Sequence, residues 1–315
     1  MRALVAALLA LCLAVPAPTL AGALEPQGDT GAHDPTLLIQ RDRWFVFTTG
    51  PGLQRLVSSD AGATWQRLAP VFSEAPAWWA EAVPAHRGLD VWAPKLFEHR
   101  GRVWVLYSIS TFGKNRSAIG LASADRPDGA WRDEGLVVQS RAEDRFNAID
   151  PDLFVERDGR LWLSYGSFWD GLRLTELSAD TLRPIGPTRF IAQRKAGIEA
   201  PTIFRRGEWV YLLASYDLCC RGADSTYNVR VGRARSIDGP FLDRDGQDLL
   251  AGGGTPLLAG GARWKGPGHQ DVARDASGDW LVHHAYDSTR GGKPHLRLKR
   301  LAWSDDGWPT VAQED

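Results

Sequence analysis

Apolar runs of strand length alternate with short polar turns along most of the chain. In residues 197–216, an apolar run opens at Ile203 and Phe204, four polar residues follow at 205–208, and an apolar, aromatic run returns over 209–215. This pattern predicts a β-hairpin with a tight turn. Helical periodicity is scarce beyond the first 23 residues, so we expect strands to dominate the fold.

The hairpin pattern occurs five times along the chain. Four copies follow a proline (Pro35, Pro94, Pro151 and Pro201), and the fifth begins at Gln270. Successive copies are separated by roughly 50 to 70 residues, a spacing typical of β-propeller blades. The sequence therefore predicts an all-β, five-bladed β-propeller, formed by residues 24–315 as a single domain.

Residues 1–23 have the pattern of a secretory signal peptide. Arg2 precedes an apolar run over residues 3–15, and small residues follow. The run is shorter than the ~20 residues that a membrane span needs. We therefore expect a cleavable signal, a secreted or periplasmic protein and no membrane association after cleavage.

Charge and cysteine content exclude several other classes of protein. With 37 Lys and Arg against 38 Asp and Glu, the chain lacks the basic footprint of a nucleic-acid-binding protein. We expect a monomer. Beyond the signal only Cys219 and Cys220 remain, and adjacent Cα atoms lie ~3.8 Å apart, below the usual disulfide range of ~4.4–6.8 Å. The sequence thus predicts two reduced, partly buried thiols.

Three acidic residues occur at nearly the same phase of the repeat. Asp34 and Asp150 directly precede a proline, Glu199 lies one position earlier, and His269 is in register in the fifth copy. Because the first strand of each blade lines the channel of a propeller, we expect these side chains to meet at one mouth of that channel. An aspartate before proline can also simply begin a turn, but three acids at one phase favour a functional site.

Paired carboxylates of this kind suit glycoside hydrolysis, which needs a general acid and a general base. We assign Glu199 as the acid, Asp34 as the base and Asp150 as the group whose negative charge raises the pKa of Glu199. His269 has two interpretations. It is either hydrogen-bonded within the channel wall, or it modulates the carboxylates or binds a channel cation, directly or through water.

Several further residues are candidates for substrate binding. Trp92, Phe112, Trp169 and Tyr227 are either packing residues or platforms for sugar rings, and Asn147 begins the motif Asn-Ala-Ile-Asp-Pro. Two tryptophans on the long connection 70–90, Trp78 and Trp79, carry the same alternatives. Residues 58–65 resemble the Asp-box of sialidases and other propellers, for which we expect a structural turn.

The motifs His-Asp-Pro, Trp-Ala-Pro, Asn-Ala-Ile-Asp-Pro and Ile-Glu-Ala-Pro, in this order and spacing, resemble glycoside hydrolase family 43. Further segments, among them GSFWDGL, CCRGADSTYNVRVGRA and GPGHQDV, resemble its endo-α-1,5-L-arabinanase branch. The resemblance spans residues 33–309. It implies a five-bladed propeller that cleaves α-1,5-L-arabinofuranosidic bonds of arabinan with inversion. The implied mode is endo-acting, with cleavage inside the polymer chain.

The resemblance also implies roles for individual residues: Asp34 as base, Glu199 as acid, and Asp150 as pKa modulator and orienter. It implies a channel ion, calcium or similar, held mostly through water near His269, and no organic cofactor. Alternatives are an exo-acting β-xylosidase or α-L-arabinofuranosidase of the same family, or a non-catalytic carbohydrate-binding propeller. One departure is Lys95, where the family commonly has aspartate; it either points outward or alters polar contacts near the substrate.

Overall fold

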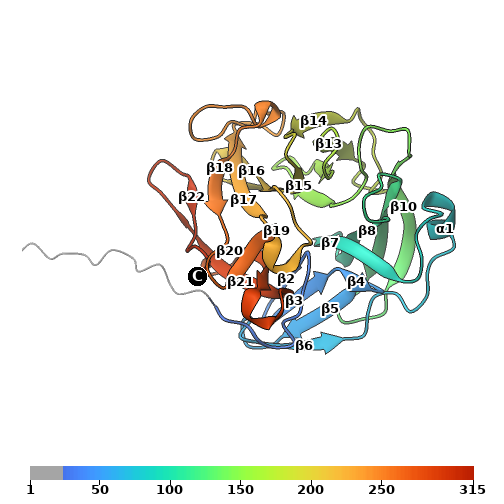
Figure 1. The fold of residues 1–315 in the computed structure, drawn as a ribbon. Coiled ribbons are helices and arrows are strands. Elements are labelled where there is room, and N and C mark those ends of the chain that lie inside the picture. Colours follow the sequence, from blue (N-terminus) through green and yellow to red (C-terminus); the bar gives the residue numbers. More distant parts are fainter. Residues whose placement is uncertain (1–23) are drawn as a thin grey trace, which may run out of the picture.

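The computed structural model describes residues 24–315, and the predicted signal peptide lies outside the described residues. These residues form five sheets arranged as a ring (Figure 1), which confirms the predicted five-bladed β-propeller. In the described part of the chain, no helix is long and apolar enough to cross a membrane.

The first two sheets each contain five strands. The first blade has the order β1 (Gln27–Gly28), β6 (Thr64–Leu68), β5 (Gln54–Ser58), β3 (Arg43–Thr48) and β2 (Thr36–Gln40). The second has the order β10 (Arg132–Ser140), β9 (Ser117–Ala124), β8 (Arg102–Ile109), β7 (Asp90–His99) and β4 (Gly50–Pro51). Because β4 comes from the first blade's part of the chain, it ties the two blades together.

The remaining three sheets contain four strands each. The third blade consists of β11 (Asp152–Val155), β12 (Leu161–Tyr165), β13 (Leu172–Leu177) and β14 (Arg189–Ala192). The fourth consists of β15 (Ile198–Arg206), β16 (Trp209–Tyr216), β17 (Asn228–Ala234) and β18 (Thr255–Leu258). The fifth consists of β19 (Trp264–Asp275), β20 (Gly278–Asp287), β21 (Lys293–Trp303) and β22 (Pro309–Thr310).

In the part of the chain that the structure describes, helices are short and occur only in the connections between strands. They are α1 (Trp78–Ala82) and the 3-10 turns η1 (Gly222–Asp224), η2 (Leu249–Ala251) and η3 (Ser288–Arg290). In α1, Trp79 is buried and donates to the Tyr107 hydroxyl, while Trp78 donates to Asp133. Neither tryptophan lines the main cavity described below. Trp79 serves packing, whereas the half-buried Trp78 lines a separate cavity of about 450 Å³.

The ring closes because the first strands of neighbouring blades contact one another. β19 contacts β2 and β15, β15 contacts β11, and β7 contacts both β2 and β11. The hydrophobic core is divided in the same way, into five buried clusters that each combine side chains of two adjacent blades. Burial of apolar surface between the sheets therefore holds every blade to both of its neighbours.

The segment before His33 joins the first blade to the last. β1 pairs with β6 of the first blade, while Leu24 and Gly31 form isolated bridges with Leu298 and His295 of the fifth. These contacts bridge the seam between the two ends of the ring.

The Asp-box forms the expected turn, between β5 and β6. Asp60 accepts hydrogen bonds from the backbone and hydroxyl of Thr64, and the Trp65 indole donates to the Gly62 carbonyl. These local hydrogen bonds close the hairpin, and the box lies outside the main cavity.

The prediction of two free thiols is wrong, because the structure has a disulfide between Cys219 and Cys220. The prediction relied on the Cα separation usual for disulfides, which adjacent residues cannot reach. Here Cys220 has a left-handed backbone, with φ 66°, in the loop between β16 and β17. Cys219 is half-buried and Cys220 exposed.

Candidate active site

One backbone feature is repeated at the inner end of all five blades. The residue directly before each proline, or before Gln270 in the fifth blade, has a left-handed conformation. These axial residues are Asp34 (φ 53°), Ala93 (φ 47°), Asp150 (φ 57°), Ala200 (φ 52°) and His269 (φ 48°). Positive φ is uncommon for residues other than glycine and often marks functional sites.

In three blades the axial residue lies inside a long first strand and interrupts its pairing. The register shifts between Trp92 and Lys95 in β7, between Glu199 and Thr202 in β15, and between Gly268 and Asp271 in β19. Bulges of this kind re-aim side chains next to active sites. Glu199 lies two positions before its proline and Asp150 lies one position before its own. The bulges explain how side chains at these different positions of the repeat can point into the same cavity.

The bulges surround a cavity of about 870 Å³ at one mouth of the channel. Asp34, Asp150, Glu199 and His269 all line it, each from a different blade. Each of these four residues is less than a tenth exposed. The structure therefore brings together all three predicted acids and the predicted histidine.

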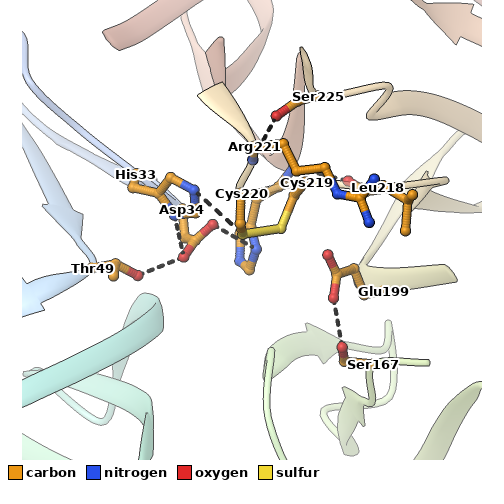
Figure 2. Close-up of a disulfide and its surroundings, with 12 residues drawn as sticks. His33, Asp34, Thr49, Ser167, Glu199, Leu218, Cys219, Cys220, Arg221 and Ser225 are labelled. Atoms are coloured by element: carbon orange, nitrogen blue, oxygen red, sulfur yellow. Dashed lines mark hydrogen bonds and ion pairs between the residues drawn. A yellow bond between two sulfur atoms is a disulfide. The ribbon is translucent and has the colours of Figure 1, made fainter. Parts of the chain in front are cut away.

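Asp34 is surrounded by imidazoles (Figure 2). Its Oδ2 accepts from the Thr49 hydroxyl at 2.6 Å and lies 2.8 Å from His33 Nδ1, while Oδ1 lies 3.2 Å from His269 Nδ1. Burial alone would raise the pKa of Asp34, but the charges of His33 and His269 and the hydrogen bond from His33 hold it well below its usual range. Asp34 is therefore ionised at neutral pH.

Glu199 has a different environment on the opposite side. Its Oε2 accepts a hydrogen bond from the Ser167 hydroxyl at 2.5 Å (Figure 2). Burial raises the pKa of Glu199 and the negative charge of Asp34 adds to this, against hydrogen bonds from Ser167 and Tyr227 that lower it. The net shift favours the protonated form.

Asp150 has a backbone amide as hydrogen-bond partner of its carboxylate and two other acids nearby. Its Oδ2 accepts from the Ala200 amide at 3.2 Å, and its own amide donates to Ser108. Burial raises the pKa of Asp150 well above its usual range, and the charges of Glu199 and Asp34 raise it further. Since two buried carboxylates resist ionising together, Asp150 and Glu199 act as a coupled pair that retains a proton.

The other predicted binding residues divide into two groups. Trp92, Phe112, Asn147 and Trp169 line the cavity, and the rings of Phe112 and Trp169 are exposed at its rim. Tyr227 is buried and does not line it. Its ring lies over Gly268, where even a Cβ atom would come within 2.1 Å of it, so glycine is required there.

Lys95 follows neither of the two expectations for it. Its ammonium points inward along the channel and lies 2.7 Å from both Asp152 Oδ1 and Asp271 Oδ1. It does not line the cavity. With Thr36 and Thr202 these residues occupy one phase of the repeat, directly after each proline or Gln270, and form a second tier behind the axial residues.

Sequence reasoning missed the groups that support Asp34. His33 stacks on His284 at 4.1 Å between ring centroids, and its Nε2 lies 2.7 Å from the Tyr286 hydroxyl. Burial lowers the pKa of His33, but Asp34 outweighs burial and raises it. A sequence signal was present for all three, because His33 directly precedes Asp34, and His284 and Tyr286 lie in the family-like segment His-His-Ala-Tyr-Asp at 283–287, within β20.

Two sets of residues could be considered for a cation. His33, Asp34 and His284 offer ligand atoms within 4.8 Å of one another. However, His284 Nδ1 already accepts the Asp34 amide and His33 Nδ1 already contacts Asp34, so this set is used for hydrogen bonding. His269 lines the cavity beside the Asp34 carboxylate. A calcium-like cation takes oxygen ligands, so it fits here if water fills most of its coordination shell and His269 contacts that water.

Comparison with known proteins gives a consistent result. The family model described as glycosyl hydrolases family 43 matches residues 25–309. An extracellular endo-alpha-(1->5)-L-arabinanase 1 of Bacillus subtilis is 43% identical over 286 residues, covering 88% of this chain and 87% of that protein. An extracellular exo-alpha-(1->5)-L-arabinofuranosidase of Cellvibrio japonicus is 38% identical over 303 residues, covering 90% and 87%.

A solved structure is similar over nearly its whole length. The GH43 endo-arabinanase from Bacillus licheniformis superposes with a TM-score of 0.86 and is 45% identical, covering 91% of this chain and 99% of that one.

Proposed function

Because this chain belongs to glycosyl hydrolase family 43, we propose that it cleaves α-1,5-L-arabinofuranosidic bonds inside arabinan, with inversion, outside the cytoplasm. The observation that carries the proposal is the cavity in which one ionised and two pKa-raised carboxylates converge. The names of the Bacillus subtilis and Cellvibrio japonicus relatives, which are 43% and 38% identical to this chain, support arabinan as the substrate. Extracellular relatives and the expected signal peptide support secretion.

In the proposed reaction Asp34 is the general base. Its carboxylate is ionised at neutral pH, because the neighbouring imidazoles hold its pKa low. It accepts a proton from a water molecule as the water oxygen forms a bond to the anomeric carbon. Single displacement from the face opposite the leaving group inverts the anomeric configuration.

Glu199 is the general acid. Burial raises the pKa of its carboxyl, which favours the protonated form, and the carboxyl donates this proton to the glycosidic oxygen as the bond to the anomeric carbon breaks. The Ser167 hydroxyl fixes the orientation of its carboxyl group. The charge of Glu199 raises the pKa of Asp150, and since two buried carboxylates resist ionising together, we propose that Asp150 opposes ionisation of Glu199 in return. The Ala200 amide orients Asp150.

We also propose a divalent cation such as calcium near His269, held mostly through water. When bound, it would supply positive charge beside Asp34 and so favour the ionised base. The chain's own residues already provide the acid, the base and the orienting hydrogen bonds.

Product analysis distinguishes endo from exo cleavage. The substrates are debranched arabinan and, for comparison, an aryl arabinofuranoside and xylan. We expect mixed oligosaccharides from arabinan and little release from the other two. Only monosaccharide from arabinan would favour the exo mode, for which the similarity to the Cellvibrio japonicus protein is the supporting observation. Absence of any product would favour a non-catalytic sugar-binding propeller.

A further inference from the structure

The disulfide lies in the wall of the active site, although the proposed reaction does not use it. Cys219 and Cys220 line the cavity together with Asp34 and Glu199. Figure 2 shows the two sulfur atoms between the side chains of these acids. The disulfide and the two acids therefore face the same space.

The loop that carries the disulfide is fixed to the base side of the site. The Cys220 amide donates to the Tyr286 hydroxyl at 3.0 Å, and this hydroxyl also lies 2.7 Å from His33 Nε2. Cys220 Sγ is 4.0 Å from the same nitrogen. Because His33 contacts Asp34 through its other ring nitrogen, a single side chain separates the disulfide from the base.

The same loop continues to the acid side. The Arg221 amide donates to the Ser225 hydroxyl, and the Thr226 amide donates to the Leu218 carbonyl, which closes the loop on itself. The chain then enters Tyr227, whose phenol influences the pKa of Glu199. The loop thus spans the gap between base and acid, with the disulfide at its centre.

A disulfide and two thiols would present different surfaces here. Cys220 has a left-handed conformation that non-glycine residues rarely adopt, and the disulfide that ties it to Cys219 carries no hydrogen-bond donor. Two thiols would add S–H donors and release the loop to relax. A pre-organised apolar surface lowers the cost of ordering a ligand against it.

We propose that the Cys219–Cys220 disulfide is a substrate-positioning platform, which packs against the apolar C–H face of the sugar ring held between Asp34 and Glu199. The identity of that sugar rests on the proposed function. The platform is lost when a dithiol reductant opens the bond. The reductant gives two electrons and two protons to the two sulfurs, which become thiols, and is itself oxidised to a cyclic disulfide.

The test uses the full chain with Cys12→Ser, so that Cys219 and Cys220 are its only cysteines. Hydrolysis of debranched arabinan is measured before and after treatment with dithiothreitol, and alkylation followed by intact mass measurement verifies the redox state. We expect KM to rise about tenfold on reduction while kcat changes less than about threefold, because a platform contacts substrate and transition state alike. Reoxidation should restore KM.

A variant separates positioning from folding. Cys219→Ser with Cys220→Ser should show the raised KM without reductant, no response to dithiothreitol and an unchanged melting temperature. Unchanged kinetics after verified reduction would overturn the inference, as would a fall in kcat together with a lower melting temperature. If the oxidised protein releases nothing from arabinan, the proposed function fails instead.

Discussion

At the residue scale, three carboxylates in one cavity acquire different properties from their immediate partners. Asp34 contacts three imidazoles and a threonine hydroxyl, whereas Glu199 has a serine hydroxyl and Asp150 a backbone amide. Imidazoles can carry positive charge and hydroxyls cannot. The contrast separates the pKa of the base from those of the other two acids, as acid–base catalysis requires.

Neutral substitutions of the acid and the base should each abolish most of the activity. We expect Asp34→Asn and Glu199→Gln to lower kcat on debranched arabinan by about 10²–10⁴-fold, because each removes a proton-transfer step while preserving side-chain size. Rates of oligosaccharide release measure the effect, and an unchanged melting temperature shows that the fold is intact. Retained activity in Glu199→Gln would contradict its role as acid.

Removal of Asp150 should change the pH profile. Glu199 must be protonated to act, so activity falls as pH rises through its pKa. Asp150→Asn removes a carboxylate whose charge opposes ionisation of Glu199, so the pKa of Glu199 falls. We expect the decline of kcat at high pH to move to lower pH by roughly one unit. Asp125→Asn, on an exposed turn, is the matched control and should leave the profile unchanged.

At the element scale, the inner strands show what sequence patterns can and cannot predict. The hairpin of β15 and β16 and the convergence of three acids follow from alternation and repeat phase. The left-handed axial residues do not, since alanine at positions 93 and 200 carries no sign of positive φ. The first strand of the fourth blade accordingly begins at Ile198, well before the predicted start at Ile203.

Contacts between distant segments decide the positions that the sequence left open. Tyr227 is an aromatic residue of the kind that can stack on a sugar ring, but its packing over Gly268 buries it. Because the two residues are far apart in sequence, this contact could not be predicted. Lys95 takes neither of its two expected positions, because it lies two residues after the axial Ala93, in the second tier. The second-tier residues share a phase just as the acids do, so a search of the repeat two positions later would have found them.

The energetic cost of the left-handed axial conformation can be tested at an axial residue that has no role in proton transfer. Ala93 is buried with φ 47°, and its amide donates to Thr49. We expect Ala93→Val to lower the free energy of unfolding by about 1–3 kcal/mol, because a β-branched side chain is disfavoured at positive φ and must also fit a packed site. Denaturant unfolding measures this, with the exposed Ala80→Val in α1 as control, expected below about 1 kcal/mol. Equal losses would argue against strain.

At the scale of the whole molecule, the axis carries two tiers of charge with different purposes. Within residues 24–315, the carboxylates of the cavity tier have no lysine or arginine partner, and the pKa values of two of them are raised. The second tier pairs its carboxylates with Lys95, and this single ammonium connects the second, third and fifth blades. Separating the tiers lets the ring be held together without neutralising the acids that face the substrate.

Loss of Lys95 should therefore destabilise the whole ring. Asp152 and Asp271 are almost completely buried, and Asp271 also accepts from the Thr36 hydroxyl and the Leu37 amide. Lys95→Met preserves much of the side-chain volume but leaves two buried carboxylates without their cation. We expect the free energy of unfolding to fall by about 3–5 kcal/mol. The exposed Lys195→Met is the matched control, expected within about 0.5 kcal/mol of the parent.

A companion variant shows whether charge or packing is responsible for that loss. Burial and the charge of Asp271 raise the pKa of Asp152 against the effect of Lys95, so the unpaired site should regain stability when its carboxylates are neutral. Lys95→Met combined with Asp152→Asn and Asp271→Asn should recover part of the loss in denaturant unfolding. If the triple variant is no more stable than Lys95→Met alone, packing rather than charge holds the second tier together, and the axial ammonium is not the tie between blades.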